Sequence, residues 1–496
     1  MSQEIVKKKK MPWTYWLHLV IGLGFMLGFP LLDPIEPITK VGMTVLGVFI
    51  GMVYLWSALD SIWPSLIGLL LIALAGFVPE LSGYAAVKAL FLNAFGAETV
   101  IVLVLGMVLF AGVEYVGCTK YMARFFMKMK LLEGRPYVFL LIFLVCSYVI
   151  SGLTNPMAAM LILWPIAIEI SNKFGYKRND KIFYTLICGV YLASTLGQPM
   201  FPFKGASYVI VSAYEKVSGV TVNYGSYIAY NIIMSIILLI CFVLFVRFVL
   251  RPDVEGFKKI TVAELTHEQL PKMNRQQIAF FIMIVVYVLA LIAPNFLPKS
   301  IPLIGFLANI GILGVTIICV AVLMILPFNG EPMMNFKGIA KKSFNWDIFF
   351  LVAAALYSCN AMTDASTGIK PFLIQALQPL LGGKPDLVFV LLILAFALIT
   401  TNFANNAGMA VVLIPVVIAF ADQYPGVDST VLCMSICMMV FVALLTPAAS
   451  PYCGMLHAQR DLVDYSQILR LFVPMVVIAL VVYTLVGYQI ANVLFR

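Results

Sequence analysis

The chain alternates long apolar runs with short polar segments from near residue 14 to residue 494. Most of the runs reach the roughly 20 apolar residues that a helix needs to cross a hydrocarbon core of about 30 Å. The pattern predicts an all-α, polytopic membrane protein that has the lipid bilayer as a partner. The predicted apolar segments are 14–32, 41–58, 63–79, 98–116, 137–170, 182–197, 206–214, 228–250, 278–294, 303–327, 346–361, 387–421, 429–445 and 468–494.

Two of these segments are too long for one span and contain polar residues at their centres. Segment 137–170 is broken at Thr154 to Pro156, and segment 387–421 is broken at Asn402 to Asn406. Lysines and arginines flank the first segment on both sides, whereas few flank the second. Basic residues mark the cytoplasmic side, so we expect two re-entrant hairpins that open from opposite faces. The total is about eleven transmembrane helices plus the hairpins, with the N-terminus cytoplasmic and the C-terminus outside.

Two further helices are interrupted by prolines. The first break runs from Gly197 to Pro202 and the second from Thr446 to Pro451. Proline removes a backbone donor, and free backbone groups inside a bilayer are tolerated only beside protein or a water-filled cavity. Both breaks are therefore candidate sites.

An offset of 250 residues relates the two hairpins. It pairs Ser151 with Thr401, Asn155 with Asn405, and Pro165 with Pro415. A span with a proline break follows each hairpin, and this order is typical of an inverted-repeat transporter. We expect a first repeat at 1–250, a cytoplasmic linker at 251–277 and a second repeat at 278–496.

Composition excludes several other classes of protein. Hydrophobic residues make up 62% of the chain and charged residues 11%, with a mean hydropathy of +1.01, which excludes a soluble protein. The net charge of +9 comes from short segments between spans, so we read it as a topology signal and expect no nucleic acid partner. The nine cysteines form no CxxC pair and no metal spacing, and no catalytic cluster appears. We expect neither an enzyme nor a cofactor.

Hairpin tips and helix breaks have a chemical use inside a membrane. Helix N-termini attract anions, while carbonyl, hydroxyl and amide oxygens coordinate cations. For any single Asn, Thr or Ser at these points, capping of a half-helix is an equally good interpretation. Four breaks in two matched pairs favour a binding site.

At these residues, and at Leu413-Ile414-Pro415, the chain resembles the divalent anion/sodium symporter family, which moves dicarboxylates, citrate or sulfate by an elevator movement. The resemblance covers nearly the whole chain and implies a homodimer. The substrate-binding residues that it implies are Thr154, Asn155, Gln198, Pro199, Lys204, Asn405, Asn406, Thr446 and Pro447. The sodium-binding residues that it implies are Ser151, Asn155, Gly197, Thr401, Ala404, Asn406 and Leu445.

The first tip departs from the Ser-Asn-Thr motif of that family. Aligned through Pro165 the motif becomes Asn155-Pro156-Met157, and with a shift of one residue it becomes Thr154-Asn155-Pro156. We predict that Lys204 replaces a lost cation or contacts the anion. Snorkelling of its side chain to the membrane surface is the alternative.

These features predict cation-coupled symport of a small anion, a di- or tricarboxylate, across the cell (inner) membrane. Sodium is the expected coupling ion and the proton the alternative. A carrier of sulfate or arsenite and a sodium/proton antiporter are the competing functions, and the lack of an aspartate at either tip favours symport. Glu114 falls near the end of a predicted span, His457 follows the second break, and neither receives a role.

Overall fold

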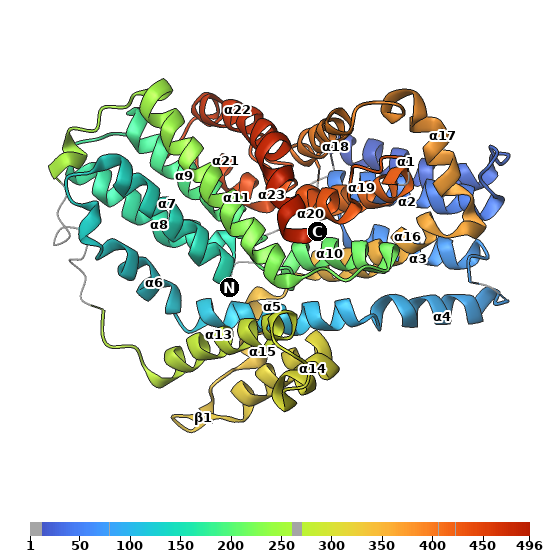
Figure 1. The fold of residues 1–496 in the computed structure, drawn as a ribbon, viewed down its shortest axis with the longest axis horizontal. Helices are drawn as coiled ribbons and strands as arrows, with labels where there is room; N and C mark the ends of the chain where they lie inside the picture. Colours follow the sequence, from blue (N-terminus) through green and yellow to red (C-terminus); the bar gives the residue numbers. More distant parts are fainter. Residues whose placement is uncertain (1–11, 79, 260–269, 405, 422) are drawn as a thin grey trace, which may run out of the picture. The chain divides into compact units, whose positions relative to one another are not determined.

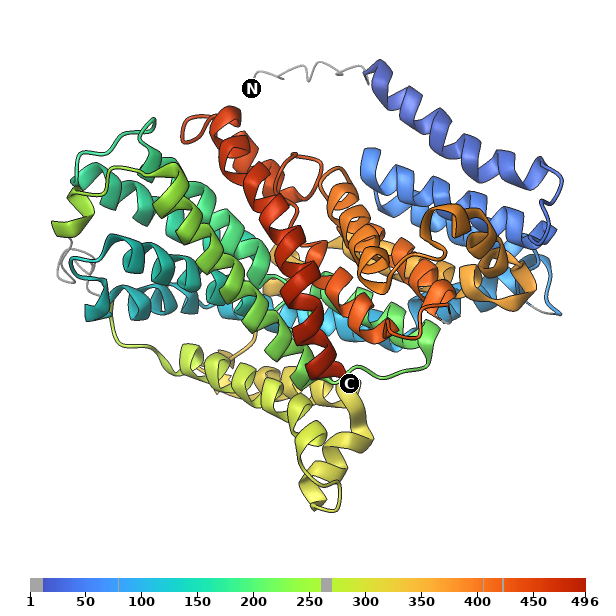
Figure 2. The ribbon, with the colours of Figure 1, turned by 45° about the horizontal axis from the view of Figure 1, so that its top comes forward.

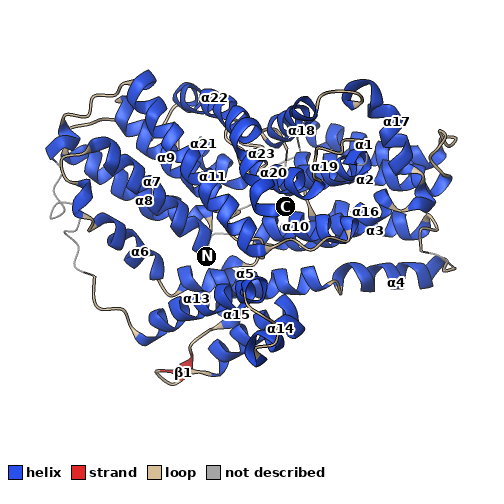
Figure 3. Cartoon of the chain, in the orientation of Figure 1, coloured by secondary structure: helices blue, strands red, loops and turns tan. Residues whose placement is uncertain are grey.

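The computed structural model describes residues 12–496 except 79, 260–269, 405 and 422. Figure 3 shows that the described residues are helical apart from loops and one small hairpin, formed by β1 (Pro327–Phe328) and β2 (Glu331–Pro332). The chain divides into two compact units, Met1–Phe95 with Trp346–Ala376, and Gly96–Asn345 with Leu377–Arg496. The all-α prediction is confirmed.

The smaller unit joins the N-terminal helices to a helix from far along the chain. Its helices are α1 (Trp13–Gly28), η1 (Phe29–Leu31), α2 (Lys40–Ala58), α3 (Ile62–Leu74), α4 (Gly83–Phe95), α16 (Trp346–Thr363) and η5 (Ala365–Thr367). Helix α16 packs against α2, α3 and α4. The N–H of Thr39 donates to Thr367 O at 3.0 Å, and the Thr39 hydroxyl caps α2.

The larger unit holds both predicted hairpins. Its helices are α5 (Glu98–Tyr115), α6 (Cys118–Met127), η2 (Lys130–Leu132), α7 (Pro136–Leu153), α8 (Pro156–Lys173), α9 (Lys181–Gly197), α10 (Gly205–Ser218), α11 (Tyr224–Phe245), η3 (Val246–Leu250), η4 (Gly256–Lys259), α13 (Arg275–Phe296), α14 (Pro302–Ile325), α15 (Phe336–Ser343), α18 (Asp386–Thr401), α19 (Asn406–Ala421), α20 (Ser429–Met439), α21 (Pro451–Ala458), α22 (Tyr465–Val482), η6 (Tyr483–Gly487) and α23 (Tyr488–Phe495). Helix α17 (Ile369–Leu381) crosses the boundary between the units.

Each predicted hairpin is a pair of packed helices. Helices α7 and α8 meet at Thr154 and Asn155, and α18 and α19 meet between Thr401 and Asn406. Both arms of the first hairpin pack on α9, which lies beside them in Figure 1, and both arms of the second pack on α20. Each hairpin therefore packs against the helix that follows it in the chain.

Fewer helices have the length of a membrane span than the sequence predicts. Among the described residues, nine helices are long and apolar enough to cross a membrane, or ten if α17 and α18 are one bent span. The predicted span 63–79 is shorter than expected, because α3 ends at Leu74 and Gly76 takes a φ of +81°. Helices α4, α6, α15 and α17 were not predicted as separate elements.

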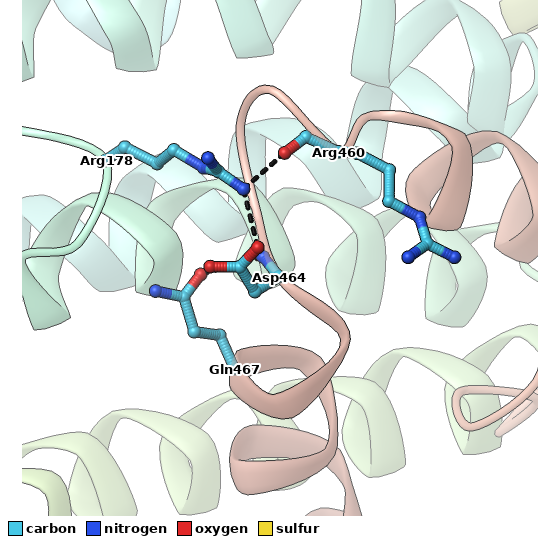
Figure 4. Close-up of polar contacts among 4 residues, drawn as sticks. All are labelled: Arg178, Arg460, Asp464 and Gln467. Carbon is cyan, nitrogen blue, oxygen red and sulfur yellow. Dashed lines mark hydrogen bonds and ion pairs between the residues drawn. The ribbon is translucent and has the colours of Figure 1, made fainter.

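Polar contacts define one end of the larger unit. Arg178, which follows the first hairpin, donates to the Asp464 carboxylate at 2.6 Å and to the Arg460 carbonyl (Figure 4). Asp464 begins α22, and its N–H donates to Gln467 Oε1 at 2.9 Å. The loop after the first hairpin and the loop before the last long helix thus lie at the same end.

A second set of contacts defines the opposite end of this unit. The Tyr214 hydroxyl, at the end of α10, lies 2.8 Å from Thr430 Oγ1 at the start of α20. Arg496 donates to Gly426 O at 2.9 Å. In Figure 2 the last helices, drawn in red, run beside α11 to the C-terminus. Arg496 and Gly426, which precedes α20, thus lie at the same end of the larger unit.

The close approach of α2 to the segment after α16 gives a first prediction. A Cβ atom on Gly42 would lie 1.9 Å from Thr367 O, whereas one on Gly24 would have no neighbour within 4 Å. We expect Gly42→Ala to destabilise the purified protein by about 1–3 kcal/mol, because the backbone must move. Thermal unfolding in detergent measures this, with Gly24→Ala as the matched control. Equal melting temperatures for the two variants would contradict the packing described.

Candidate functional site

The chain is unwound after α20, and the buried side chain of Asn402 forms hydrogen bonds with the backbone there. The helix ends at Met439, and no helix follows until Pro451. Asn402 Oδ1 accepts from the N–H groups of Leu444 and Leu445 at 2.8 and 2.9 Å, and Asn402 Nδ2 donates to Val442 O at 3.1 Å. The amide of Asn402 therefore replaces three of the hydrogen bonds that the helix no longer provides.

Two further side chains complete the pairing of the unwound backbone. The Thr401 hydroxyl donates to Val440 O at 2.6 Å, and the Tyr191 hydroxyl of α9 donates to Ala443 O at 2.5 Å. The second break was predicted to begin at Thr446, and this is wrong. It begins at Val440, because side chains from the hairpin tip and from α9 replace the helical hydrogen bonds six residues earlier.

Three oxygen atoms meet at the second tip. Thr401 Oγ1 lies 3.0 Å from Asn406 Oδ1 and 2.6 Å from Val440 O. These atoms come from α18, α19 and the unwound segment after α20, and all three residues are buried. A hydroxyl carries one proton, so the group is rich in lone pairs, which is the donor set that hard cations prefer.

Most of the residues predicted for the second tip lie in this network. Thr401 and Asn406 are in contact, the Leu445 N–H is held by Asn402, and the Thr446 hydroxyl donates to Asn402 O. Ala404 lies in the same tip, where its N–H donates to Thr400 O at 3.0 Å. Pro447 is exposed. Asn405 lies outside the described residues.

At the first tip, Asn155 makes two different contacts. Its Oδ1 accepts from Ala158 N–H at 3.0 Å, which caps α8, and its Nδ2 donates to Glu114 Oε2 at 2.7 Å. Thr154 donates to Ile150 O at 2.5 Å and so turns back onto α7. Asn155 therefore caps α8 through its oxygen and connects the tip to Glu114 of α5 through its nitrogen.

Lys204 points at the first tip. Its ammonium group donates to Ser151 O at 3.0 Å and to Gly152 O at 2.6 Å, and it lies 5.1 Å from the centre of the Phe110 ring. The half-buried side chain therefore contacts the end of α7 and does not snorkel. The Ser151 hydroxyl donates to Ser194 O of α9 at 2.6 Å.

The first break lies against the same hairpin. A Cβ atom on Gly197 would lie 2.2 Å from Tyr148 O, so only glycine allows α9 to approach α7 this closely. Gln198 is half-buried and Pro199 is buried directly after it. The structure therefore brings Gly197 and Lys204 to the first hairpin, and Gln198 and Pro199 lie between them in the chain.

Sequence reasoning missed three residues of these networks. Glu114 and Asn402 were given no role, although each bonds to a hairpin tip or forms part of one. Asn231 of α11 was also missed: its Oδ1 accepts from the Tyr148 hydroxyl at 2.7 Å, and its Nδ2 lies 3.2 Å from the Met438 sulfur. Asn402 lies in the predicted break and Glu114 near the end of a predicted span, while Asn231 is a polar residue inside an apolar run.

Comparisons with known proteins agree on the class of this chain. Residues 10–496 match the model of the sodium:sulfate symporter transmembrane region. A relative from Haemophilus influenzae, named as an uncharacterised transporter, is 22% identical over 477 residues, which are 95% of this chain and 96% of the relative. An uncharacterised transporter of Methanocaldococcus jannaschii is 22% identical over 305 residues. That match covers 62% of this chain and 63% of the length of the relative.

A solved structure shares the fold. The crystal structure of the YdaH transporter from Alcanivorax borkumensis superposes with a TM-score of 0.58 at 14% sequence identity. The match covers 90% of this chain and 98% of that protein. The arrangement of helices is thus that of a membrane transporter, while the identity is too low to carry over any site.

Removal of the Asn402 side chain tests its role in the unwound segment. We expect Asn402→Ala to lower the melting temperature strongly or to abolish the folded peak in size-exclusion chromatography. The reason is that each buried backbone group left without a partner costs about 1–3 kcal/mol. Asn93→Ala, at an exposed position of α4, is the control. A melting temperature equal to that of the control would show that Asn402 does not hold the break.

Proposed function

Because this chain belongs to the sodium:sulfate symporter family, we propose that it is a secondary transporter that couples the movement of a small anion to a cation. The family and the fold are those of transporters. The observation that carries the proposal is the oxygen cluster of Thr401, Asn406 and Val440, in which two hairpin arms and an unwound helix converge.

We infer that the cation binds at this cluster. A sodium ion there would bridge α18, α19 and the segment after α20, so its binding would hold the hairpin tip against the break. The tip sequence from Thr401 to Asn406 contains no carboxylate, which favours sodium over a proton at this position. Order at the tip would then depend on the cation, which is the basis of coupling.

We infer that the anion binds beside the same tips. Four half-helices begin at the tips and breaks, namely α8 at Pro156, α10 at Gly205, α19 at Asn406 and α21 at Pro451. A helix N-terminus carries roughly half a positive charge and attracts anions. Main-chain donors in such a setting suit a substrate with two or three carboxylates, in keeping with the dicarboxylate and citrate carriers that the sequence resembles.

Two other functions have support. Sulfate offers oxygens to the same donors, and the family description names it. Proton coupling, or exchange of sodium for protons, gains support from Glu114, which places a carboxylate against Asn155 although the tip sequence itself has none.

Orientation and assembly form part of the proposal. The end of the larger unit that holds Arg178, Lys181 and Lys258 would face the cytoplasm, since basic residues collect on that side. A homodimer in the cell membrane, with an elevator movement, follows from the family resemblance.

Uptake into proteoliposomes tests the proposed function. We expect radiolabelled succinate or citrate to accumulate when sodium is higher outside, and a pH gradient alone to drive little uptake. Accumulation of labelled sulfate but not of the carboxylates would reassign the substrate. Sodium efflux driven by an inward proton gradient, with no anion uptake, would make the protein an antiporter and contradict the proposal.

A single substitution tests the cation site. Asn406→Ala removes one of the three oxygens, so we expect the sodium concentration for half-maximal uptake to rise about tenfold or more, which corresponds to roughly 1.4 kcal/mol of binding energy. Asn93→Ala should leave that concentration unchanged. Unaltered sodium dependence in a folded Asn406→Ala protein would place the cation elsewhere.

A further inference from the structure

In each hairpin, a carbonyl at the end of the first arm accepts a hydrogen bond from the broken segment that follows. The donor is charged in one hairpin and neutral in the other. The offset of 250 residues pairs Gly152 with Asn402, and each residue contributes its carbonyl at the end of the first hairpin arm. Asn402 O accepts from the hydroxyl of Thr446. Gly152 O accepts from the ammonium group of Lys204 at 2.6 Å. Both donors come from the broken segment that follows the hairpin, but only the donor in the first half is charged.

The surroundings of the Lys204 ammonium group are those of a cation site. Two of its three protons are directed to main-chain carbonyls at the C-terminal end of α7, which carries the negative end of the helix dipole. The Phe110 ring presents a further electron-rich group at 5.1 Å. The Glu114 carboxylate of α5 reaches the same tip through Asn155 Nδ2, at 2.7 Å. Two carbonyls and a ring thus contact the ammonium group, and a carboxylate lies at the same hairpin tip.

A neutral side chain would leave this environment unbalanced. The carboxylate of Glu114 is held in place by Asn155 at 2.7 Å, so it cannot turn away without loss of that hydrogen bond. A half-buried carboxylate and the negative end of the α7 dipole both favour a positive charge at this position. We expect the position to hold a cation, supplied either by the chain or by the solution.

We propose that Lys204 is a built-in cation at the first hairpin, and that the first half of this protein accordingly takes no exchangeable cation. In terms of the proposed function, on which this second step rests, only the second tip binds a mobile ion. The first hairpin is then tied to its break at every salt concentration. The second hairpin becomes the element whose order follows the sodium concentration.

Removal of the charge should create a sodium site. We expect Lys204→Ser to lower the melting temperature of the purified protein in choline chloride, and added sodium chloride to restore several degrees, because an ion that binds only the folded state stabilises it. Wild-type protein, with the second tip as its one sodium site, should show a smaller rise in melting temperature at equal ionic strength. A Lys204→Ser protein whose melting temperature responds to sodium no more than wild type would overturn the proposal.

Matched variants separate the charge from the packing. Lys204→Arg keeps the charge, so its melting temperature should respond to sodium as that of wild type does. Lys128→Ser removes an exposed charge at the end of α6 and should also behave as wild type. Glu114→Gln combined with Lys204→Ser removes both charges and should lose the gained response. If Lys204→Ser does not fold, Lys204→Gln decides the question by the same measurement, because its amide can still donate to the carbonyls.

This test does not depend on transport. If the second tip binds no sodium, wild-type protein will show no sodium-dependent stabilisation, yet Lys204→Ser will still gain one. If the proposal about Lys204 fails while the proposed function holds, wild-type uptake will depend on sodium and Lys204→Ser will add no second component. In liposomes, the Hill coefficient for sodium should be higher in Lys204→Ser than in wild type, because one binding site is added.

Discussion

The peptide groups of the unwound segments must find hydrogen-bond partners inside an apolar protein, and the larger unit is organised around this requirement. Between Val440 and Leu445 the partners are the side chains of Asn402, Thr401 and Tyr191. None of them belongs to the broken helix itself. The second hairpin, α9 and the segment after α20 are thus tied into one piece, and separation of any two of them would expose unpaired amides.

The two hairpins bind backbone groups with different kinds of side chain. The second uses neutral amides and hydroxyls, which gather three oxygens at its tip. The first uses an ammonium group and a carboxylate on either side of its tip. The polar contacts described at the first tip thus include two charged groups, Lys204 and Glu114, whereas those of Thr401, Asn402 and Asn406 at the second tip are neutral.

Local sequence predicted the hairpins because their signals are local. Asn155-Pro156 and the polar run from Asn402 to Asn406 interrupt apolar stretches that are otherwise continuous. The start of the second break could not be found this way, since Val440 to Leu445 reads as an ordinary apolar helix and only side chains from elsewhere unwind it. Glu114 was missed for a related reason: its position in a helix does not reveal that another element brings Asn155 to it.

The ion pair at one end of the larger unit has a mechanical consequence. Asp464 both starts α22 and receives Arg178, so the first turn of that helix and the chain leaving the first hairpin share one anchor. Both side chains are more than two-fifths exposed, and an ion pair this open is weakened by dissolved salt. The ionic strength of the compartment that this end faces would therefore set the stiffness of the joint between hairpin and helix.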